Sequence, residues 1–230
     1  MSNYHYMMRF IIVGDVSVGK SCILKRFESD DFQFTSAPTM GIEFIRKPMT
    51  IENNQLMIQV WDTSGEEKMF SMTSSYYKNT CGVILVFDVT RKETFDHLKT
   101  WVQKINDHAH QSSRRILIGN KVDLEFQRVI SKNEAETFAK QNNLQYLETS
   151  AKTSKNVYEA FNLLALNVFN DAKAGKIMVT KDGTYGLKKG DLVGGSIRGR
   201  DESELPGTSF QLNQQAPVKQ DAKTNCCDKI

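Results

Sequence analysis

Eight residues, GDVSVGKS from Gly14 to Ser21, constrain the fold of this 230-residue chain more than any other segment. They match the spacing G-x-x-x-x-G-K-[ST]. Because they follow an apolar run and precede an amphipathic stretch, we predict a strand, a tight turn and a helix in succession. Glycine lets the backbone turn so that N–H groups point inward, and the helix presents its positive N-terminal end to the same space. The segment therefore predicts a phosphate-binding loop, and a glycine-rich turn that binds nothing is the alternative.

Two side chains of this loop have a predicted chemical role. The Lys20 ammonium can reach β- and γ-phosphates, and the Ser21 hydroxyl can ligate Mg²⁺. The motif identifies neither the nucleotide nor the output. The residues predicted to contact a nucleotide here are Gly14, Asp15, Val16, Ser17, Val18, Gly19, Lys20, Ser21 and Cys22.

Apolar runs alternate with amphipathic stretches from Met7 to about Ala172. The expected strands are Met7–Val13, Ile42–Ile51, Leu56–Asp62, Val83–Asp88, Ile116–Asn120 and Tyr146–Glu148. The expected helices are Gly19–Glu28, Lys68–Lys78, Lys92–His108, Lys132–Asn142 and Asn156–Asp171. This repetition predicts an α/β fold with a mostly parallel six-stranded sheet and helices on both faces.

Two details of this prediction are specific. Asn53–Asn54 is the expected tight turn between the second and third strands. Val157, Phe161, Leu164 and Val168 recur at helical spacing, which indicates core packing of the last helix.

The composition changes after Ala172, where Gly, Ser, Lys, Gln and Asp dominate and apolar residues become sparse. Such a segment buries too little apolar surface to offset its ordering entropy. We therefore predict one domain over residues 1–172 and a largely disordered tail over residues 173–230.

Charge and hydropathy exclude other classes. A formal net charge of +3 without basic clusters argues against a nucleic-acid role. The longest apolar runs are far too short to span a bilayer, and the first ten residues lack the features of a secretory signal. We expect the chain in the cytosol, with Cys22 and Cys81 as buried thiols.

The tetrapeptide Asn120-Lys121-Val122-Asp123 follows an expected strand and predicts the base. A carboxylate only accepts hydrogen bonds, and guanine offers two adjacent donors, whereas adenine offers a ring acceptor there. Asp123 therefore favours guanine, Asn120 can tie the loops together, and the Lys121 stem can cover the base face. Ser150, Ala151 and Lys152 follow the last strand, where a backbone N–H can reach guanine O6.

With these residues in order, the chain resembles the Ras-like small GTPases, and within them the Rab branch. The resemblance covers residues 7 to about 172 and is carried by GDVSVGKS, PTMGIEF, WDTSGEE, NKVD and ETSAK. It implies a P-loop NTPase fold and a GTP/GDP switch with Mg²⁺ that hydrolyses GTP slowly and recruits effectors to membranes in vesicle traffic. The main alternative is a nucleotide-binding scaffold without useful turnover, and a P-loop ATPase or kinase is a second.

The resemblance also assigns roles to single residues. Thr39 and Asp62 join Ser21 on the Mg²⁺ side, Gly65 contacts the γ-phosphate, and Phe32 lies against the guanine. Core packing is the alternative for each aromatic of the implied effector surface. That surface comprises Gly41, Ile42, Phe44, Trp61 and Tyr76.

Two positions depart from the family pattern. Glu66 stands where most relatives have a glutamine that orients the attacking water, and Val16 brings branched bulk into the phosphate loop. An ionised glutamate only accepts hydrogen bonds and repels the γ-phosphate. With Glu66, Lys20 and Gly65 as the catalytic set, we expect very slow intrinsic hydrolysis unless an activating protein supplies an arginine and a glutamine. The alternative is that Glu66 points into solvent.

The chain ends with Cys226 and Cys227 followed by Asp-Lys-Ile, which fits a Rab-type double-cysteine end better than C-a-a-X. Two geranylgeranyl chains give stable membrane anchoring, whereas one gives marginal binding. The implied partners are an exchange factor, a GTPase-activating protein, a Rab escort protein, a GDP-dissociation inhibitor and effectors. The implied location is the cytosolic face of an endomembrane, in exchange with the cytosol; two unmodified surface cysteines are the alternative.

Overall fold

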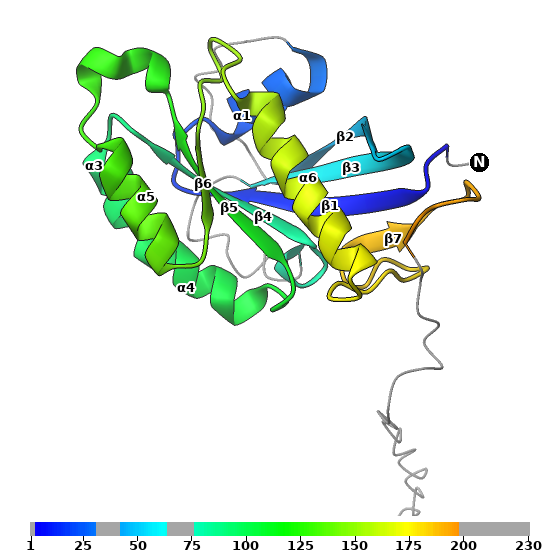
Figure 1. Ribbon diagram of the computed structural model, residues 1–230. Helices are drawn as coiled ribbons and strands as arrows, with labels where there is room; N and C mark the ends of the chain where they lie inside the picture. Colours follow the sequence, from blue (N-terminus) through cyan, green and yellow to red (C-terminus); the bar gives the residue numbers. More distant parts are fainter. Residues whose placement is uncertain (1–2, 31–41, 64–75, 198–230) are drawn as a thin grey trace, which may run out of the picture.

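A computed structural model of the chain describes residues 3–30, 42–63 and 76–197 (Figure 1). One seven-stranded sheet has the order β2-β3-β1-β4-β5-β6, with β7 paired to β1. The β2–β3 and β1–β7 pairs are antiparallel and the other pairs are parallel. The strands are β1 (Tyr6–Val13), β2 (Ile42–Ile51), β3 (Asn54–Thr63), β4 (Gly82–Asp88), β5 (Arg114–Asn120), β6 (Gln145–Glu148) and β7 (Leu187–Lys189).

Helices cover both faces of this sheet, as predicted. The helical elements are α1 (Lys20–Ser29), α3 (Lys92–Asp96), α4 (Leu98–His108), the 3-10 segment η2 (Val122–Gln127), α5 (Lys132–Gln141) and α6 (Val157–Lys173). Helices α1 and α6 pack on one face, and α3, α4 and α5 pack on the other. The predicted α/β class is therefore confirmed, but the predicted number of six strands was wrong, because β7 adds a seventh strand beside β1.

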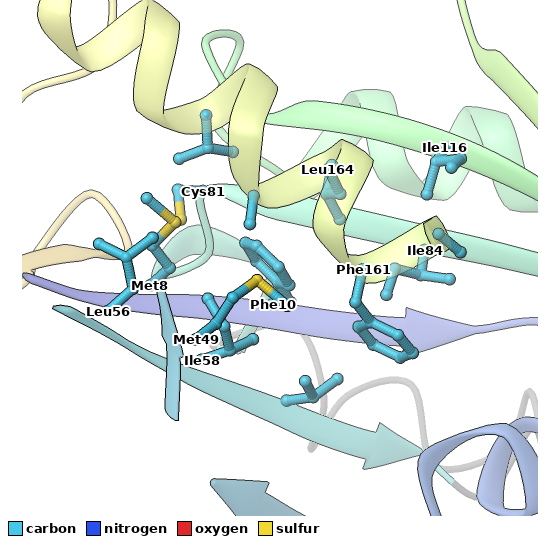
Figure 2. Packing of buried hydrophobic residues seen from close by; sticks show 14 of the residues in the cluster. Met8, Phe10, Met49, Leu56, Ile58, Cys81, Ile84, Ile116, Phe161 and Leu164 are labelled. Carbon is cyan, nitrogen blue, oxygen red and sulfur yellow. The ribbon is translucent and has the colours of Figure 1, made fainter. Parts of the chain in front are cut away.

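The alternation of side chains along β1 explains why both faces are covered. Phe10 and Ile12 point into the core under α6, while Ile11 and Val13 point into the opposite core. Figure 2 shows Phe161 of α6 directed toward β1, the strand that carries Met8 and Phe10. All four members of the predicted α6 stripe are buried, so their reading as core residues is confirmed.

The structure differs locally from the prediction at a turn and within a helix. The β2–β3 turn is Glu52–Asn53, one residue earlier than predicted, and both residues have positive φ angles of 45° and 62°. Positive φ at both central residues is the geometry of a type I′ hairpin turn. The expected helix Lys92–His108 is divided at His97 into α3 and α4, although His97 itself keeps helical backbone angles (φ −71°, ψ −12°). Of the expected helix Lys68–Lys78, only the helical residues 76–78 lie in the described part of the chain.

The prediction of disorder was wrong for residues 173–197. The segment after α6 returns to the sheet, and β7 pairs antiparallel with Tyr6–Met8 of β1. Its few apolar side chains fill core positions: Ile177, Val179, Leu187 and Ile197 are at most 6% exposed. These four buried side chains suffice to attach the segment to the core, although Val193 of the same segment is exposed. The folded unit extends to Ile197, and residues 198–230 lie outside the described part.

Backbone hydrogen bonds also fix this C-terminal segment to the sheet. Arg9 N donates to Gly186 O at 2.7 Å, and Cys81 Sγ donates to the same oxygen at 3.2 Å. Tyr6 OH donates to Ile197 O at 3.1 Å and accepts from Ile197 N at 2.9 Å. The segment is therefore an integral part of the fold at the end of the sheet where β1 begins.

The two described cysteines differ in environment. Cys81 is a buried free thiol, as predicted, and burial raises its pKa to about 12. The prediction of burial was wrong for Cys22, which is only partly buried and packs against the α1–α6 core. Among the described helices, none has the length and apolar character needed to cross a bilayer.

Candidate nucleotide-binding site

The predicted nucleotide residues converge at one edge of the sheet, where the parallel strands end. The phosphate loop follows β1, Asp62 lies near the end of β3, Asn120 ends β5 and Ser150 follows β6. Parallel strands bring their carboxyl ends to the same edge, which is where open α/β sheets bind ligands. Segments up to 136 positions apart in the sequence, from Gly14 to Ser150, therefore form one site.

The conformation of the phosphate loop requires its two glycines. Gly14 has φ 138°, and a Cβ there would lie 2.2 Å from Val86 O. Gly19 has φ 98°, and a Cβ there would lie 2.4 Å from Asn120 Nδ2. Helix α1 begins directly after Gly19, so its unpaired N–H groups and positive end border the loop. The backbone has the form that an anion-binding loop needs.

Lys20 supplies a buried cation inside the loop. Its Nζ donates to Gly14 O and to Asp15 O, each at 2.8 Å. Burial lowers the pKa of Lys20 to about 8, while the charges of Asp62 and Asp15 act in the opposite direction. A phosphate beside this ammonium would stabilise its charged form, which fits the role predicted for it.

Ser21 and Asp62 have the arrangement expected of a magnesium site. Ser21 Oγ donates to Asp62 Oδ2 at 2.5 Å, and Asp62 Oδ1 is buried without a hydrogen-bond partner in the described structure. Burial raises the pKa of Asp62 above its usual range, although Ser21 and Lys20 oppose the shift. A buried, unsatisfied carboxylate oxygen beside a hydroxyl fits a hard cation such as Mg²⁺. When bound, Mg²⁺ neutralises charge on the phosphates.

Asn120 ties the base loops to the phosphate loop, as predicted. Its Nδ2 donates to Val18 O at 2.9 Å, and its Oδ1 accepts from Thr149 Oγ1 at 3.1 Å. Ser150 Oγ donates to Asp123 Oδ1 at 2.6 Å, so the two loops expected to read guanine are in direct contact. The Asp123 carboxylate thereby has a fixed position at the edge of the site.

Lys121 has a strained backbone and a fixed ammonium. Its φ is 69°, and its Nζ donates to Ser17 O at 2.9 Å and lies 2.7 Å from Asp88 Oδ2. The positive φ of a non-glycine residue costs free energy and persists only where the surroundings determine it. Asp88, at the end of β4, thus supports the site, and the motif-based prediction did not include it.

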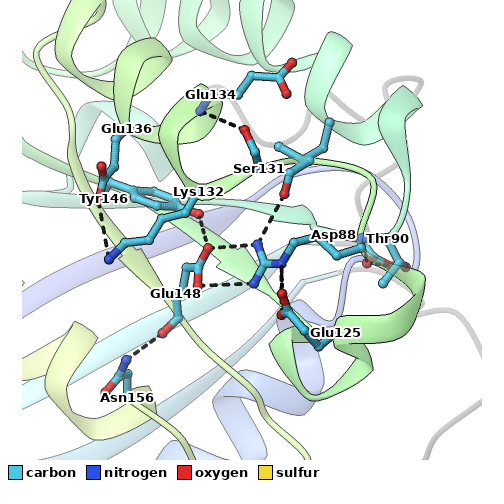
Figure 3. Close-up of polar contacts among 12 residues, drawn as sticks. Asp88, Thr90, Glu125, Ser131, Lys132, Glu134, Glu136, Tyr146, Glu148 and Asn156 are labelled. Atoms are coloured by element: carbon cyan, nitrogen blue, oxygen red, sulfur yellow. Dashed lines mark hydrogen bonds and ion pairs between the residues drawn. The ribbon is translucent and has the colours of Figure 1, made fainter.

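A second group of residues, which the sequence analysis did not identify, supports the two loops expected to bind the base. Arg128 forms a two-pronged ion pair with Glu148, with Nη1–Oε1 at 2.9 Å and Nη2–Oε2 at 3.2 Å. It also contacts Glu125, while Tyr146 OH donates to Glu148 and Asn156 donates to the Glu148 carbonyl. Figure 3 shows Tyr146 and Asn156 directed toward Glu148. Bidentate pairs of this kind fix geometry as well as adding energy, so the network holds the loops after β5 and β6 together.

The three predicted effector aromatics, Phe44 of β2, Trp61 of β3 and Tyr76, form a continuous array of rings. The ring centroids of Phe44 and Trp61 are 4.9 Å apart, and those of Trp61 and Tyr76 are 4.8 Å apart. Phe44 is 46% exposed, while the other two rings are partly buried against the neighbouring core. The three residues therefore do not belong to the fully buried core, and they form one surface.

Some of the remaining predicted residues are described by the structure, and the others lie outside the described part of the chain. Val16 and Ser17 are exposed, Val18 is buried, and Lys152 is exposed. Ala151 O accepts from Arg26 Nε at 2.9 Å, which joins this loop to α1. The predictions for Phe32, Thr39, Gly41, Gly65, Glu66, Cys226 and Cys227 lie outside the described residues.

Comparison with known families gives the same class as the geometry. A sequence model of the Ras family matches residues 9–170, more than two thirds of the chain. The chain belongs to the Ras family: it is a small GTPase with the G-domain fold, a molecular switch that binds and hydrolyses guanine nucleotide. Members of this family bind Mg²⁺ with the nucleotide and interact with exchange factors, GTPase-activating proteins and effectors. The matched region ends before β7.

Proposed function

We propose that this small GTPase is a Rab-type switch that recruits effectors to an endomembrane during vesicle traffic. The aromatic array of Phe44, Trp61 and Tyr76 is the observation that carries the proposal. Phe44 and Trp61 lie on β2 and β3, the strand pair that connects the two segments expected to sense the γ-phosphate, and Tyr76 follows the second of these segments. Aromatic groups of this kind are typical anchors of protein interfaces.

The double-cysteine end supplies the membrane part of the proposal. Geranylgeranylation of Cys226 and Cys227 would provide the two lipid chains that stable anchoring requires. Because the folded unit extends to Ile197, the proposed tether is shorter than a tail beginning at residue 173. About 28 residues separate Ile197 from Cys226, and a random coil of that length has a mean reach of about 30 Å.

Reconstitution on vesicles tests this proposal. Doubly prenylated full-length protein should bind vesicles in either nucleotide state, and a GDP-dissociation inhibitor should extract the GDP form much more readily than the GTP form. Cys226→Ser alone should weaken vesicle binding, and Cys226→Ser/Cys227→Ser should abolish it. If the inhibitor does not distinguish the two forms, or if the double variant still sediments with vesicles, the Rab-type cycle is wrong.

We further propose that intrinsic hydrolysis is very slow because Glu66 replaces the water-orienting glutamine. Single-turnover measurement of GTP hydrolysis tests this, and Glu66→Gln should raise the unstimulated rate. An unchanged rate would mean that Glu66 does not limit the reaction. Turnover stimulated by a Rab-type activating protein separates a timed switch from the alternative, a scaffold that stays in one nucleotide state.

A further inference from the structure

Asp15 places a carboxylate inside the phosphate loop, next to the groups that would hold an anion. Its side chain is only 17% exposed, and its own carbonyl accepts from Lys20 Nζ. Its negative charge also acts on the Lys20 ammonium. A mobile carboxylate here would repel phosphates and compete with them for Lys20. The structure must therefore determine where this carboxylate points.

Two side chains from α3 and α4 hold both carboxylate oxygens of Asp15. Trp101 Nε1 donates to Asp15 Oδ1 at 2.7 Å, and His97 Nδ1 lies 2.7 Å from Asp15 Oδ2. Because an ionised carboxylate only accepts hydrogen bonds, His97 Nδ1 carries the proton in this contact. Both distances are typical of strong hydrogen bonds to a charged acceptor.

The helical spacing of His97 and Trp101 accounts for this geometry. His97 lies between α3 and α4, and Trp101 follows four residues later on the same side. Trp101 is only 4% exposed, whereas the His97 side chain is 60% exposed. The same region contacts the loop once more, because Arg91 Nη1 donates to Val16 O at 3.3 Å.

We propose that His97 and Trp101 are positioning residues for phosphate binding, which hold the Asp15 carboxylate away from Lys20 and the phosphates. The proposal rests on the guanine-nucleotide binding of the Ras family and is independent of the proposed Rab role. A purely structural reading makes a different prediction. In that reading Asp15 only satisfies the buried indole N–H, and the contacts do not affect phosphates.

Dissociation of a fluorescent GDP from the full-length chain distinguishes the two readings. His97→Phe/Trp101→Phe keeps aromatic side chains at both positions and removes both donors. We expect it to release GDP about tenfold or more faster than the wild type, since hydrogen bonds to charged groups are worth at least that factor. His97→Phe alone changes a mostly exposed residue that folding tolerates, and it should give part of the effect. His110→Phe is the matched control, since His110 contacts Tyr185 and Ser112 instead.

The decisive measurement repeats these variants in an Asp15→Asn background. Without the carboxylate charge, the double variant should release GDP at nearly the rate of Asp15→Asn alone. Wild-type release rates in His97→Phe/Trp101→Phe, or an equal acceleration in both backgrounds, would overturn the proposal. A wild-type chain that binds no GDP would instead refute nucleotide binding itself, and the proposal with it.

Discussion

The two ends of the central sheet are built in different ways. At the carboxyl ends of β1, β3 and β5, short contiguous motifs place glycines, a buried lysine and carboxylates around one site. At the opposite end, β7 and its flanking loops close the sheet with isolated apolar residues set among polar ones. The first end is specified by the chemistry of a ligand, and the second is specified by packing.

This difference has a physical origin. A loop that approaches a phosphate needs particular residues at consecutive positions, because several backbone N–H groups must point at one anion. Closing a core needs only enough apolar surface at the right places, and many spacings provide it. Changes at the two ends should therefore affect different properties: nucleotide selectivity and affinity at the first, and the free energy of unfolding at the second.

The largest expected effect concerns base selectivity at the motif-built end. Asp123→Ala removes the acceptor expected to face the guanine N1–H and 2-amino groups, and it leaves Ser150 Oγ without this partner. We expect the preference for GDP over ADP, measured by competition calorimetry, to fall by about 10³-fold or more.

Asp96→Asn is the matched control for Asp123→Ala. Asp96 is an exposed carboxylate paired with Lys92 on α3, away from the base loops. Its substitution should leave the preference for GDP over ADP unchanged. A wild-type chain with no such preference would contradict the assignment of Asp123.

How much the sequence could predict also differs between the ligand-binding end and the packed end of the sheet. Lys20, Asp62 and Asn120 were found because each belongs to a local motif whose spacing reflects contact with one ligand. The Arg128–Glu148 pair and the His97–Asp15 contact could not be found, because they join residues 20 and 82 positions apart through loop geometry. Ile197 meets Tyr6 across 191 positions, and composition alone predicted disorder there. Contacts between distant segments need the fold itself.

The second prediction tests the packing-built end. Leu187→Ala removes a fully buried side chain of β7, and it should lower the free energy of unfolding by about 2–4 kcal/mol. In a chain of this size the expected fall in Tm is roughly 10 °C. The GDP dissociation rate should stay within about twofold of the wild type, because β7 is remote from the phosphate loop.

Val193→Ala provides the comparison for Leu187→Ala. Val193 lies in the same C-terminal segment but is 96% exposed, so its substitution should change stability by less than about 0.5 kcal/mol. Equal Tm values for the two variants would show that the segment does not contribute to the folded core.

A third prediction uses the pH dependence of binding at the motif-built end. Burial lowers the pKa of Lys20 to about 8 in the ligand-free protein, and a bound phosphate favours its charged form. Binding therefore takes up a proton above pH 8, and GDP affinity should fall by about tenfold between pH 7 and pH 9. Calorimetry in buffers of different ionisation enthalpy would measure the proton uptake. Release of a proton on binding in this range would contradict the assignment.

The smallest expected effect concerns Asp62, whose carboxylate should favour ligand binding but lower the free energy of unfolding of the ligand-free protein. Burial raises the pKa of this carboxyl, so its ionised form destabilises the folded protein when no cation is present. The folded protein is therefore more stable at low pH, where Asp62 is protonated. This stability is lost as the pH rises from the pKa of Asp62 in the unfolded chain to its higher pKa in the folded protein. At pH 7, without nucleotide and with a chelator, Asp62→Asn should therefore have a Tm at least equal to that of the wild type. With Mg²⁺ and GDP the order should reverse, by about 3–6 °C if ligand binding weakens tenfold. Thermal unfolding in both conditions measures the effect, and an Asp62→Asn variant that is less stable in both would place Asp62 with the packing residues instead of the ligand site.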